Sequence, residues 1–387
     1  MSPLSKTALG FALFLAGVAG AVACDSSSDP APATVPGDGG TKADGSSGGF
    51  DVDGGGGDAS PGKDLPCLGD GAPMTIAKNL PYAKVKLGAA PNQVEGDFLV
   101  DYGTTATFVD LGAWAVPPKT SGCDPAKTGQ TCTFDAFDFF GPWGSVQLIT
   151  SDYSKIPQPP RQAGILGTDF TAAVAVTLDY PRSRIRRALK ETMCVDAAMV
   201  LAGFAPVSTL GFFAKDTSTL KGLSDVVAGA PVGTKVPNVP TIPVRIAGTD
   251  SVAQLDTGFA DTFVPYSINV NQPLLDAMST KNPGSITRQP AKDLALTTCV
   301  AGVQETVEAY ELAPGKFAEI LAIDGTVARR YNTAVVFVKK PPTEAKVCGG
   351  IGTWTAPAAQ IGGSFFAEAG VTVFDPLTSR VWISKDQ

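Results

Sequence analysis

The sequence predicts an all-β protein whose two lobes are related by an internal repeat, with a pseudo-twofold axis between them. Apolar and polar residues alternate in short runs, as in residues 83–87 and 242–246, and a period of two is typical of half-buried strands. From about Cys67 onward, long helical patterns are scarce. In addition, two passages from the first half of the globular part recur in the same order in its second half, which indicates a duplicated unit.

The N-terminus, residues 1–23, is typical of an export signal. Lys6 gives a short positive region, and an uncharged, mostly apolar run follows from Ala8 to Ala23. The run ends directly before Cys24, as in a lipobox. We therefore expect Cys24 to be lipidated and the protein to be a membrane-anchored lipoprotein of the bacterial cell envelope, on its periplasmic or surface face. An ordinary signal peptide cut near Ala23 and a plain N-terminal anchor are the alternatives.

The segment that follows, residues 24–65, consists mainly of Gly, Ser, Asp, Pro and Ala and contains one aromatic residue, Phe50. Such a composition does not bury enough apolar surface to fold, and its Gly and Ser content is typical of a flexible tether. Beyond the tether we expect a first lobe over residues 66–195, a connector over 196–236 and a second lobe over 237–387.

Part of the connector, residues 197–214, is uncharged and mostly apolar, and its length is borderline for a membrane span. The stretch also contains Gly203, Pro206 and Gly211. A buried connector or a pair of core strands is therefore the better interpretation.

The composition excludes several functional classes. The chain contains no histidine, so Ser-His-Asp triads, Cys-His dyads and His-containing zinc sites cannot be built. The formal net charge is −7, which leaves no basic footprint for nucleic acid. A hydrolase made from this chain has to use carboxylates, Lys, Tyr or an unassisted nucleophile, and we expect neither a metal ion nor a cofactor.

Cysteine usage indicates disulfides. Six cysteines remain beyond Cys24, and an even number in what we take to be an exported chain is typical of disulfides. Six cysteines permit 15 pairings, and proximity in the sequence favours 123 with 132 and 299 with 348, which leaves 67 with 194. The disulfide candidates are Cys67, Cys194, Cys123, Cys132, Cys299 and Cys348.

The first repeated passage reads strand, turn, strand and then Asp-x-Gly. In the first half it covers residues 81–109 and contains Asp101-Tyr102-Gly103; in the second half it covers residues 242–265 and contains Asp256-Thr257-Gly258. An apolar run follows each Asp-x-Gly. The second repeated passage covers residues 164–185 and 360–381. Each copy begins with an Ile/Leu-Gly segment and ends with Ser-Arg before a β-branched residue.

A duplicated chain with one Asp-x-Gly loop per half has a chemical use. Two such loops that meet across a pseudo-twofold axis bring Asp101 and Asp256 into contact, where like charges do not both ionise easily. One carboxyl stays protonated and the other is a base, so together they can activate a water molecule. The alternative is that Asp101 and Asp256 are turn aspartates that cap strand ends, and for a single Asp-x-Gly that interpretation would be preferred. Two in register within a repeat favour the catalytic interpretation.

This arrangement resembles the pepsin-like and retropepsin-like aspartic peptidases, over roughly residues 75–387. The resemblance implies a two-lobed pepsin-like acid-protease fold and endopeptidase activity through water activated by Asp101 and Asp256. It implies a monomer whose substrate is a peptide or unfolded protein in extended conformation. It also implies that an apolar segment ending in glycine threads under each loop, and that the loops are supported by Gly103, Thr104, Thr257 and Gly258.

Two positions depart from the family pattern. Tyr102 stands where the family has a threonine whose hydroxyl bonds across to the other loop, and Phe259 stands where a Ser or Thr usually follows the glycine. The alternative function is therefore a catalytically impaired pepsin-like fold that binds a peptide or protein at the envelope. The family also has a flap over its cleft, for which Phe140 or Trp143 in residues 139–145 is the candidate. The alternative for that hairpin is that its aromatic residues are core.

Overall fold

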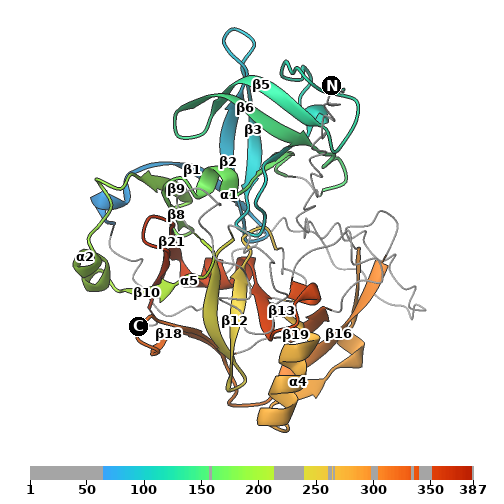
Figure 1. Cartoon of the computed structure of the whole chain (residues 1–387), viewed down its shortest axis with the longest axis vertical. Coiled ribbons are helices and arrows are strands. Elements are labelled where there is room, and N and C mark those ends of the chain that lie inside the picture. The colour runs from blue at the N-terminus through green and yellow to red at the C-terminus, as the bar shows by residue number, and fades with distance from the viewer. Residues whose placement is uncertain are drawn as a thin grey trace, which may run out of the picture.

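The computed structural model describes residues 64–156, 159–212, 239–259, 264, 266–297, 304–332, 335–339 and 351–385. Within them the protein is mostly β-sheet (Figure 1). The helices are short. They are α1 (Thr168–Thr171), α2 (Asp196–Leu201), α4 (Gln272–Lys281) and α5 (Gly363–Ala369), with 3-10 turns η1 (Pro66–Leu68), η2 (Leu111–Ala113), η4 (Pro290–Lys292) and η5 (Ile351–Thr353).

A closed six-stranded barrel forms the upper part of the molecule in Figure 1. Its closure comes from the pairing of the first and last strands in the series, through Leu87 opposite Phe137. In order around the barrel the strands are β2 (Leu80–Leu87), β3 (Val94–Val100), β7 (Gln162–Leu166), β4 (Phe108–Val109), β6 (Pro142–Thr150) and β5 (Thr131–Asp138).

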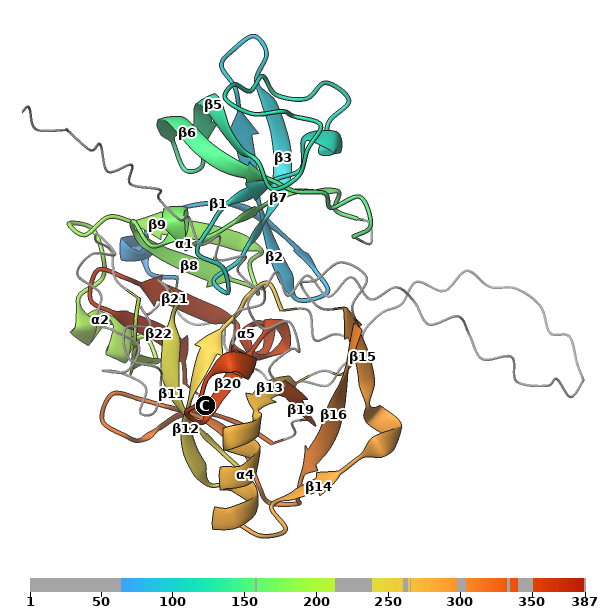
Figure 2. The same ribbon diagram turned by 45° about the vertical axis from the view of Figure 1, so that its right-hand side comes forward.

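Six further strands extend the barrel sheet on one side, so the whole sheet has twelve strands. Strands from distant parts of the chain lie side by side in it, because β8 pairs antiparallel with β21 (Figure 2). From the barrel outward the strands are β1 (Asp70–Ala77), β9 (Arg184–Ala188), β8 (Ala175–Asp179), β21 (Val371–Asp375), β22 (Arg380–Ser384) and β10 (Phe204–Ser208).

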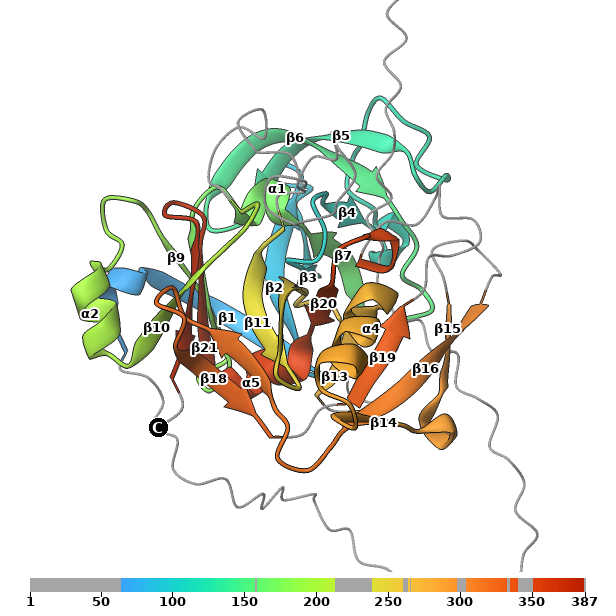
Figure 3. The ribbon, with the colours of Figure 1, turned by 60° about the horizontal axis from the view of Figure 1, so that its bottom comes forward.

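A second sheet of ten strands forms the lower part of the molecule. Helix α4 packs on it against β12 and β13 (Figure 3), and the Asn271 side chain caps the helix by accepting from Leu274 N. The strands are β14 (Ile286–Arg288), β16 (Gln304–Leu312), β19 (Val335–Lys339), β13 (Ser267–Asn271), β20 (Ala358–Ile361), β12 (Thr249–Leu255), β11 (Thr241–Ile246), β17 (Ala318–Leu321) and β18 (Val327–Tyr331), with β15 (Leu294–Thr297) beside β16.

The strands around the two Asp-x-Gly segments pair in the same sense. In the barrel, β3 is parallel to β7, β7 is antiparallel to β4, and β4 is parallel to β6. In the second sheet, β12 is parallel to β20, β20 is antiparallel to β13, and β13 is parallel to β19. Each Asp-x-Gly segment thus follows a strand that lies beside the strand of an Ile/Leu-Gly segment.

Two of the three predicted disulfides are present. The pairs Cys67–Cys194 and Cys123–Cys132 are bonded, and they indicate folding in an oxidising or secreted compartment. Cys299 and Cys348 lie outside the described residues, as do Cys24, the predicted signal and the predicted tether up to residue 63. Of the tether the structure describes Leu65 and Asp64, and the Asp64 carboxylate pairs with Arg186 on β9.

The described part of the predicted connector contributes a strand to the twelve-stranded sheet. Residues 196–212 contain α2 and β10, and β10 pairs along its whole length with β22. Phe204 and Val207 of this strand are buried. In the part of the chain that the structure describes, no helix is long and apolar enough to cross a membrane.

Candidate functional site

Asp101 lies at the end of β3, where the chain leaves the barrel wall. Its backbone N–H donates to the Leu166 carbonyl at 3.0 Å, which ties the loop to the neighbouring strand β7. Its carboxyl accepts from Gly103 N at 2.6 Å through Oδ1. The loop therefore turns tightly, and the carboxyl orientation is set by the loop's own backbone.

Asp256 lies in the same way at the end of β12. Its backbone N–H donates to the Ile361 carbonyl of β20 at 3.0 Å, and its Oδ1 accepts from Gly258 N at 2.9 Å. The two predicted catalytic aspartates thus have the same local geometry, although 155 positions separate them in the sequence.

The two loops meet face to face. A Cβ atom added to Gly103 would lie 2.3 Å from Cγ of Asp256, and one added to Gly258 would lie 2.5 Å from Cγ of Asp101. Each glycine therefore leaves room for the carboxyl of the other loop. The structure brings together both predicted aspartates and both predicted loop glycines.

Thr257 fastens one loop to the other. Its hydroxyl donates to the Val100 carbonyl at 2.6 Å and accepts from Tyr102 N at 3.0 Å. Both bonds are buried and both cross from the second loop to the first. A hydroxyl that donates to one backbone group and accepts from another fixes the separation of the two loops.

The carboxyls form an interacting acidic pair. Burial raises the pKa of Asp101 above its ordinary value, against hydrogen bonds from Gly103 and Gly258. Burial and the negative charge of Asp101 raise the pKa of Asp256 well above its ordinary value. Because each charge disfavours the other and the two carboxyls share a hydrogen bond, we expect the pair to hold one proton over a range of pH.

Tyr102, the main departure from the family pattern, is fully buried. Its ring stacks on Phe374 with the centroids 3.6 Å apart and meets the edge of Phe212 at 5.8 Å. Burial raises the pKa of its phenol, and the hydroxyl lies beside Thr171 without a hydrogen bond of good geometry. Tyrosine is therefore accommodated by aromatic packing, and only Thr257 provides the cross-loop hydroxyl.

Thr104 supports its own loop and does not bond the carboxyl. Its Oγ1 accepts from Ala106 N at 3.4 Å, and its carbonyl accepts from Thr168 N at 3.0 Å. In the second loop Phe259 has no hydroxyl to offer, but its carbonyl accepts from Gly363 N at 3.1 Å. Both loops are thus tied by backbone groups to the start of the helix that follows the threaded segment.

The threaded segments need glycine for space. A Cβ on Gly167 would lie 2.5 Å from the Ala106 carbonyl oxygen, and one on Gly362 would lie 2.7 Å from the Phe259 carbonyl oxygen. Such distances are far below van der Waals contact, so a side chain at either position has to displace the loop above it.

Gln360, the first residue of the second copy of the Ile/Leu-Gly passage, is a further site residue that was not among the predicted ones. Its Nε2 donates to Asp256 Oδ2 at 2.5 Å, and its Oε1 accepts from Asn269 Nδ2 at 2.9 Å. In the sequence, the signal for this role is a polar residue two places before the glycine of an otherwise apolar segment.

The two flap candidates lie on the hairpin of β5 and β6. Trp143 packs on Phe170 of α1 with the ring centroids 5.0 Å apart, and the guanidinium of Arg187 on β9 lies 5.8 Å from the Phe140 ring centroid. The turn between β5 and β6 is on the side of the barrel that faces α1 and β9 (Figure 1). The structure therefore shows packing contacts of Trp143 with α1 and of Phe140 with β9, and the role of either residue as a flap stays a prediction.

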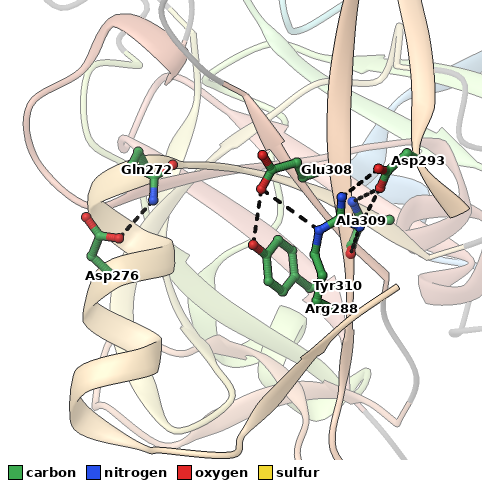
Figure 4. Close-up of polar contacts among 7 residues, drawn as sticks. All are labelled: Gln272, Asp276, Arg288, Asp293, Glu308, Ala309 and Tyr310. Carbon is green, nitrogen blue, oxygen red and sulfur yellow. Dashed lines mark hydrogen bonds and ion pairs between the residues drawn. The ribbon is translucent and has the colours of Figure 1, made fainter. Parts of the chain in front are cut away.

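Another charged cluster lies on the outer strands of the second sheet (Figure 4). Arg288 makes two hydrogen bonds of 2.6 Å to Asp293, and Glu308 accepts from the Tyr310 hydroxyl at 3.2 Å. These partly exposed charges offset one another, unlike the paired acids of the buried site. Among the described residues, no three Cys, Asp or Glu side chains gather as a metal site would require.

Comparisons with known proteins give a weak structural likeness. No protein-family model matches the chain, and no curated protein matches it. Among solved structures, the chain is similar to basic 7S globulin from soybean at 13% identity and a TM-score of 0.39, over 82% of this chain and 94% of that chain.

Proposed function

We propose that this protein is an aspartic-type endopeptidase that hydrolyses peptide bonds with water activated by Asp101 and Asp256. The observation that carries the proposal is the pair itself. Two buried carboxyls on matched loops face each other, and Thr257 links the loops. A pair of like-charged acids is costly to bury, so a fold that builds one from two separate loops has a use for it.

We also propose that the fold is a pepsin-like duplication with two lobes and a pseudo-twofold axis between the loops. Supporting this, the parallel pairing of β3 with β7 has its counterpart in β12 with β20. Each aspartate N–H donates to the residue before the threaded glycine at the same distance. The β8–β21 pairing joins equivalent strands of the two repeats.

The mechanism follows from the shared proton. The ionised carboxylate takes a proton from water as the water oxygen bonds to the peptide carbonyl carbon, and the protonated carboxyl gives its proton to the carbonyl oxygen. A gem-diol results. When it collapses, a diol proton returns to one carboxylate, the other carboxyl protonates the amide nitrogen, and the C–N bond breaks. Both products leave with the pair again singly protonated.

The proposed substrate is a peptide or unfolded protein segment in extended conformation. Extended backbone suits a site between sheets, because main-chain hydrogen bonds provide affinity and side-chain pockets provide specificity. The two disulfides agree with an envelope location, for which Cys24 would be the lipid anchor. No cofactor takes part in the proposed reaction.

The test is cleavage of a denatured protein substrate by the purified protein between pH 3 and pH 8. We expect cleavage by the wild type and a loss of at least about 10³-fold in Asp256→Asn, because the pair then has no base of the right strength. Asp152→Asn, which changes an exposed aspartate outside the site, is the matched control and should cleave normally. Equal activity in wild type and Asp256→Asn would exclude the mechanism.

The second candidate is a peptide-binding protein that does not cleave. It is favoured by the one-sided link between the loops, since Tyr102 lacks the hydroxyl position that Thr257 uses. Binding of an unstructured peptide, measured by calorimetry, without cleavage at any pH would support this candidate.

A further inference from the structure

The two halves of the carboxyl pair differ in a side-chain amide beside Asp256. Gln360 precedes Ile361, whose carbonyl accepts from Asp256 N, and its Nε2 donates to Asp256 Oδ2 at 2.5 Å. At the matched place on β7, directly before the residue that accepts from Asp101 N, stands Ile165. An isoleucine has no donor to offer the first carboxyl.

The amide is held in one orientation by its neighbour on β13. Asn269 is buried, pairs opposite Gln360 in the sheet and donates from Nδ2 to Gln360 Oε1 at 2.9 Å. Because Oε1 accepts that bond, Nε2 has to point to Asp256. The residue opposite Ile165 on β4 is Phe108. The second half thus has two linked amides where the first half has an apolar pair.

Each carboxyl has two donors outside the pair, but the donors differ in kind, because only Asp256 accepts from a side-chain amide. Asp256 accepts at both oxygens, from Gly258 N at Oδ1 and from Gln360 at Oδ2. Asp101 accepts from the backbone of Gly103 and Gly258, and among the described residues its side-chain partner is Asp256 alone. A carboxyl whose two oxygens both accept hydrogen bonds is best satisfied when it is ionised.

We propose that Gln360, oriented by Asn269, is a positioning residue that keeps Asp256 ionised and leaves the shared proton on Asp101. Asp256 is then the base that takes the water proton, and Asp101 is the acid that protonates the substrate carbonyl. This assignment rests on the proposed peptidase function and deepens it.

Burial and the charge of Asp101 raise the pKa of Asp256 further above the ordinary value than burial raises that of Asp101, so the assignment rests on the geometry of the amide and not on these shifts. The charge of Asp101 raises the pKa of Asp256, but that contribution disappears when Asp101 carries the proton. Besides burial, what remains around Asp256 is the pair of donors Gly258 and Gln360, and both lower its pKa. The asymmetry therefore depends on the amide, and removing the amide should reveal which carboxyl ionises first.

The test removes the donor and keeps the side-chain volume, in Gln360→Met. Losing one hydrogen bond to a charged group should raise the pKa of the pair's first ionisation by about one unit. The acid limb of the kcat/KM profile should therefore move to higher pH. We expect kcat to fall more than KM changes. Asn269→Leu, which frees the amide to rotate, should give a smaller shift in the same direction. Ile165→Met, at the matched place in the first half, should leave both limbs unmoved.

A second readout does not depend on cleavage. In protein labelled with ¹³C at aspartate Cγ, the two carboxyl signals are assigned with Asp101→Asn and Asp256→Asn and titrated in wild type and in each variant. A shift of the first ionisation in Gln360→Met supports the proposal even if no peptide is cut, in which case only the peptidase function fails. A shift confined to the second ionisation makes Asp101 the base and overturns the proposal, as does no shift at all. Thermal unfolding checks that each variant is folded. If Gln360→Met does not fold, the shift measured in Asn269→Leu tests the proposal in its place.

Discussion

Tyr102 shows how one residue can change the way a loop is held without changing where it lies. A threonine there would cross to the other loop through its hydroxyl, as Thr257 does. The tyrosine ring instead fills a pocket between Phe374 of β21 and Phe212. Its backbone N–H still donates to Thr257, so the main-chain part of the cross-loop link is kept. Aromatic packing below the loop thus holds it in place of the hydroxyl that a threonine at this position would supply.

This account makes Tyr102 a stabilising residue and predicts opposite results for two substitutions. Tyr102→Thr should lower the free energy of unfolding by about 3–5 kcal/mol, as large aromatic truncations do, and should reduce cleavage. Tyr102→Phe should be neutral or slightly stabilising, because the buried hydroxyl lacks a good hydrogen bond. Urea unfolding followed by fluorescence measures both. Wild-type stability in Tyr102→Thr would mean that the ring does not hold the loop.

At the scale of elements, the site depends on two strands passing beneath two loops. β7 and β20 are each followed by a glycine that lies directly under a carbonyl of the loop above, that of Ala106 in one case and that of Phe259 in the other. Each strand also accepts the backbone N–H of its aspartate. The loop and the threaded strand therefore move together, and the position of a carboxyl is set by the packing of a strand.

Gly167→Ala tests this coupling. The added Cβ would meet the backbone of Ala106, so the loop has to shift, and we expect a loss of about 1–3 kcal/mol in stability. A shift of about 1 Å at the carboxyls would cost on the order of 10²-fold in kcat. Gly71→Ala is the control, since its nearest neighbour is a flexible arginine side chain at 3.3 Å. Equal effects of the two substitutions on kcat would show that the loop is insensitive to the strand below.

Strands β3 and β12 and their Asp-x-Gly ends were predictable, because alternation and a repeated motif are local signals. The contact of Gln360 with Asn269 was not, because it depends on the register of β13 against β20. The hairpin of Phe140 and Trp143 was predicted from the order of motifs along the chain. Its direction depends on how β5 closes the barrel on β2.

In the whole molecule, one sheet contains strands from both the first and the last described parts of the chain. β1, β8 and β9 come from the first part of the chain, and β21 and β22 come from its C-terminal part. The pairing of β8 with β21 lies between the two sets. Sequence spacing predicted the disulfides at 123–132 and 67–194, but it did not predict that β10 would complete this sheet beside β22. Pairing between distant strands leaves no local signal in composition.

The buried carboxyl pair should make the stability of the whole molecule depend on pH. Both carboxyls have raised pKa values in the folded state, chiefly through burial, so protonation favours folding. Their contribution is fully present below the ordinary aspartate pKa of 3.8 and is lost as the pH rises through the folded-state values. Asp256→Asn removes one of the two charges and should therefore gain stability relative to wild type as the pH rises.

We expect the free energy of unfolding of Asp256→Asn, relative to that of wild type, to be on the order of 1–3 kcal/mol higher at pH 7 than at pH 3. One pKa unit corresponds to about 1.4 kcal/mol. Urea unfolding at several pH values, with the disulfides intact, measures it. Asp152→Asn should instead lose stability relative to wild type as the pH rises. Hydrogen bonds from Ser154 lower the pKa of Asp152, so its small contribution to stability is present only above the ordinary aspartate pKa. A difference between Asp256→Asn and wild type that does not change with pH would mean that the two carboxyls do not share a proton, and the mechanism proposed for them would lose its physical basis.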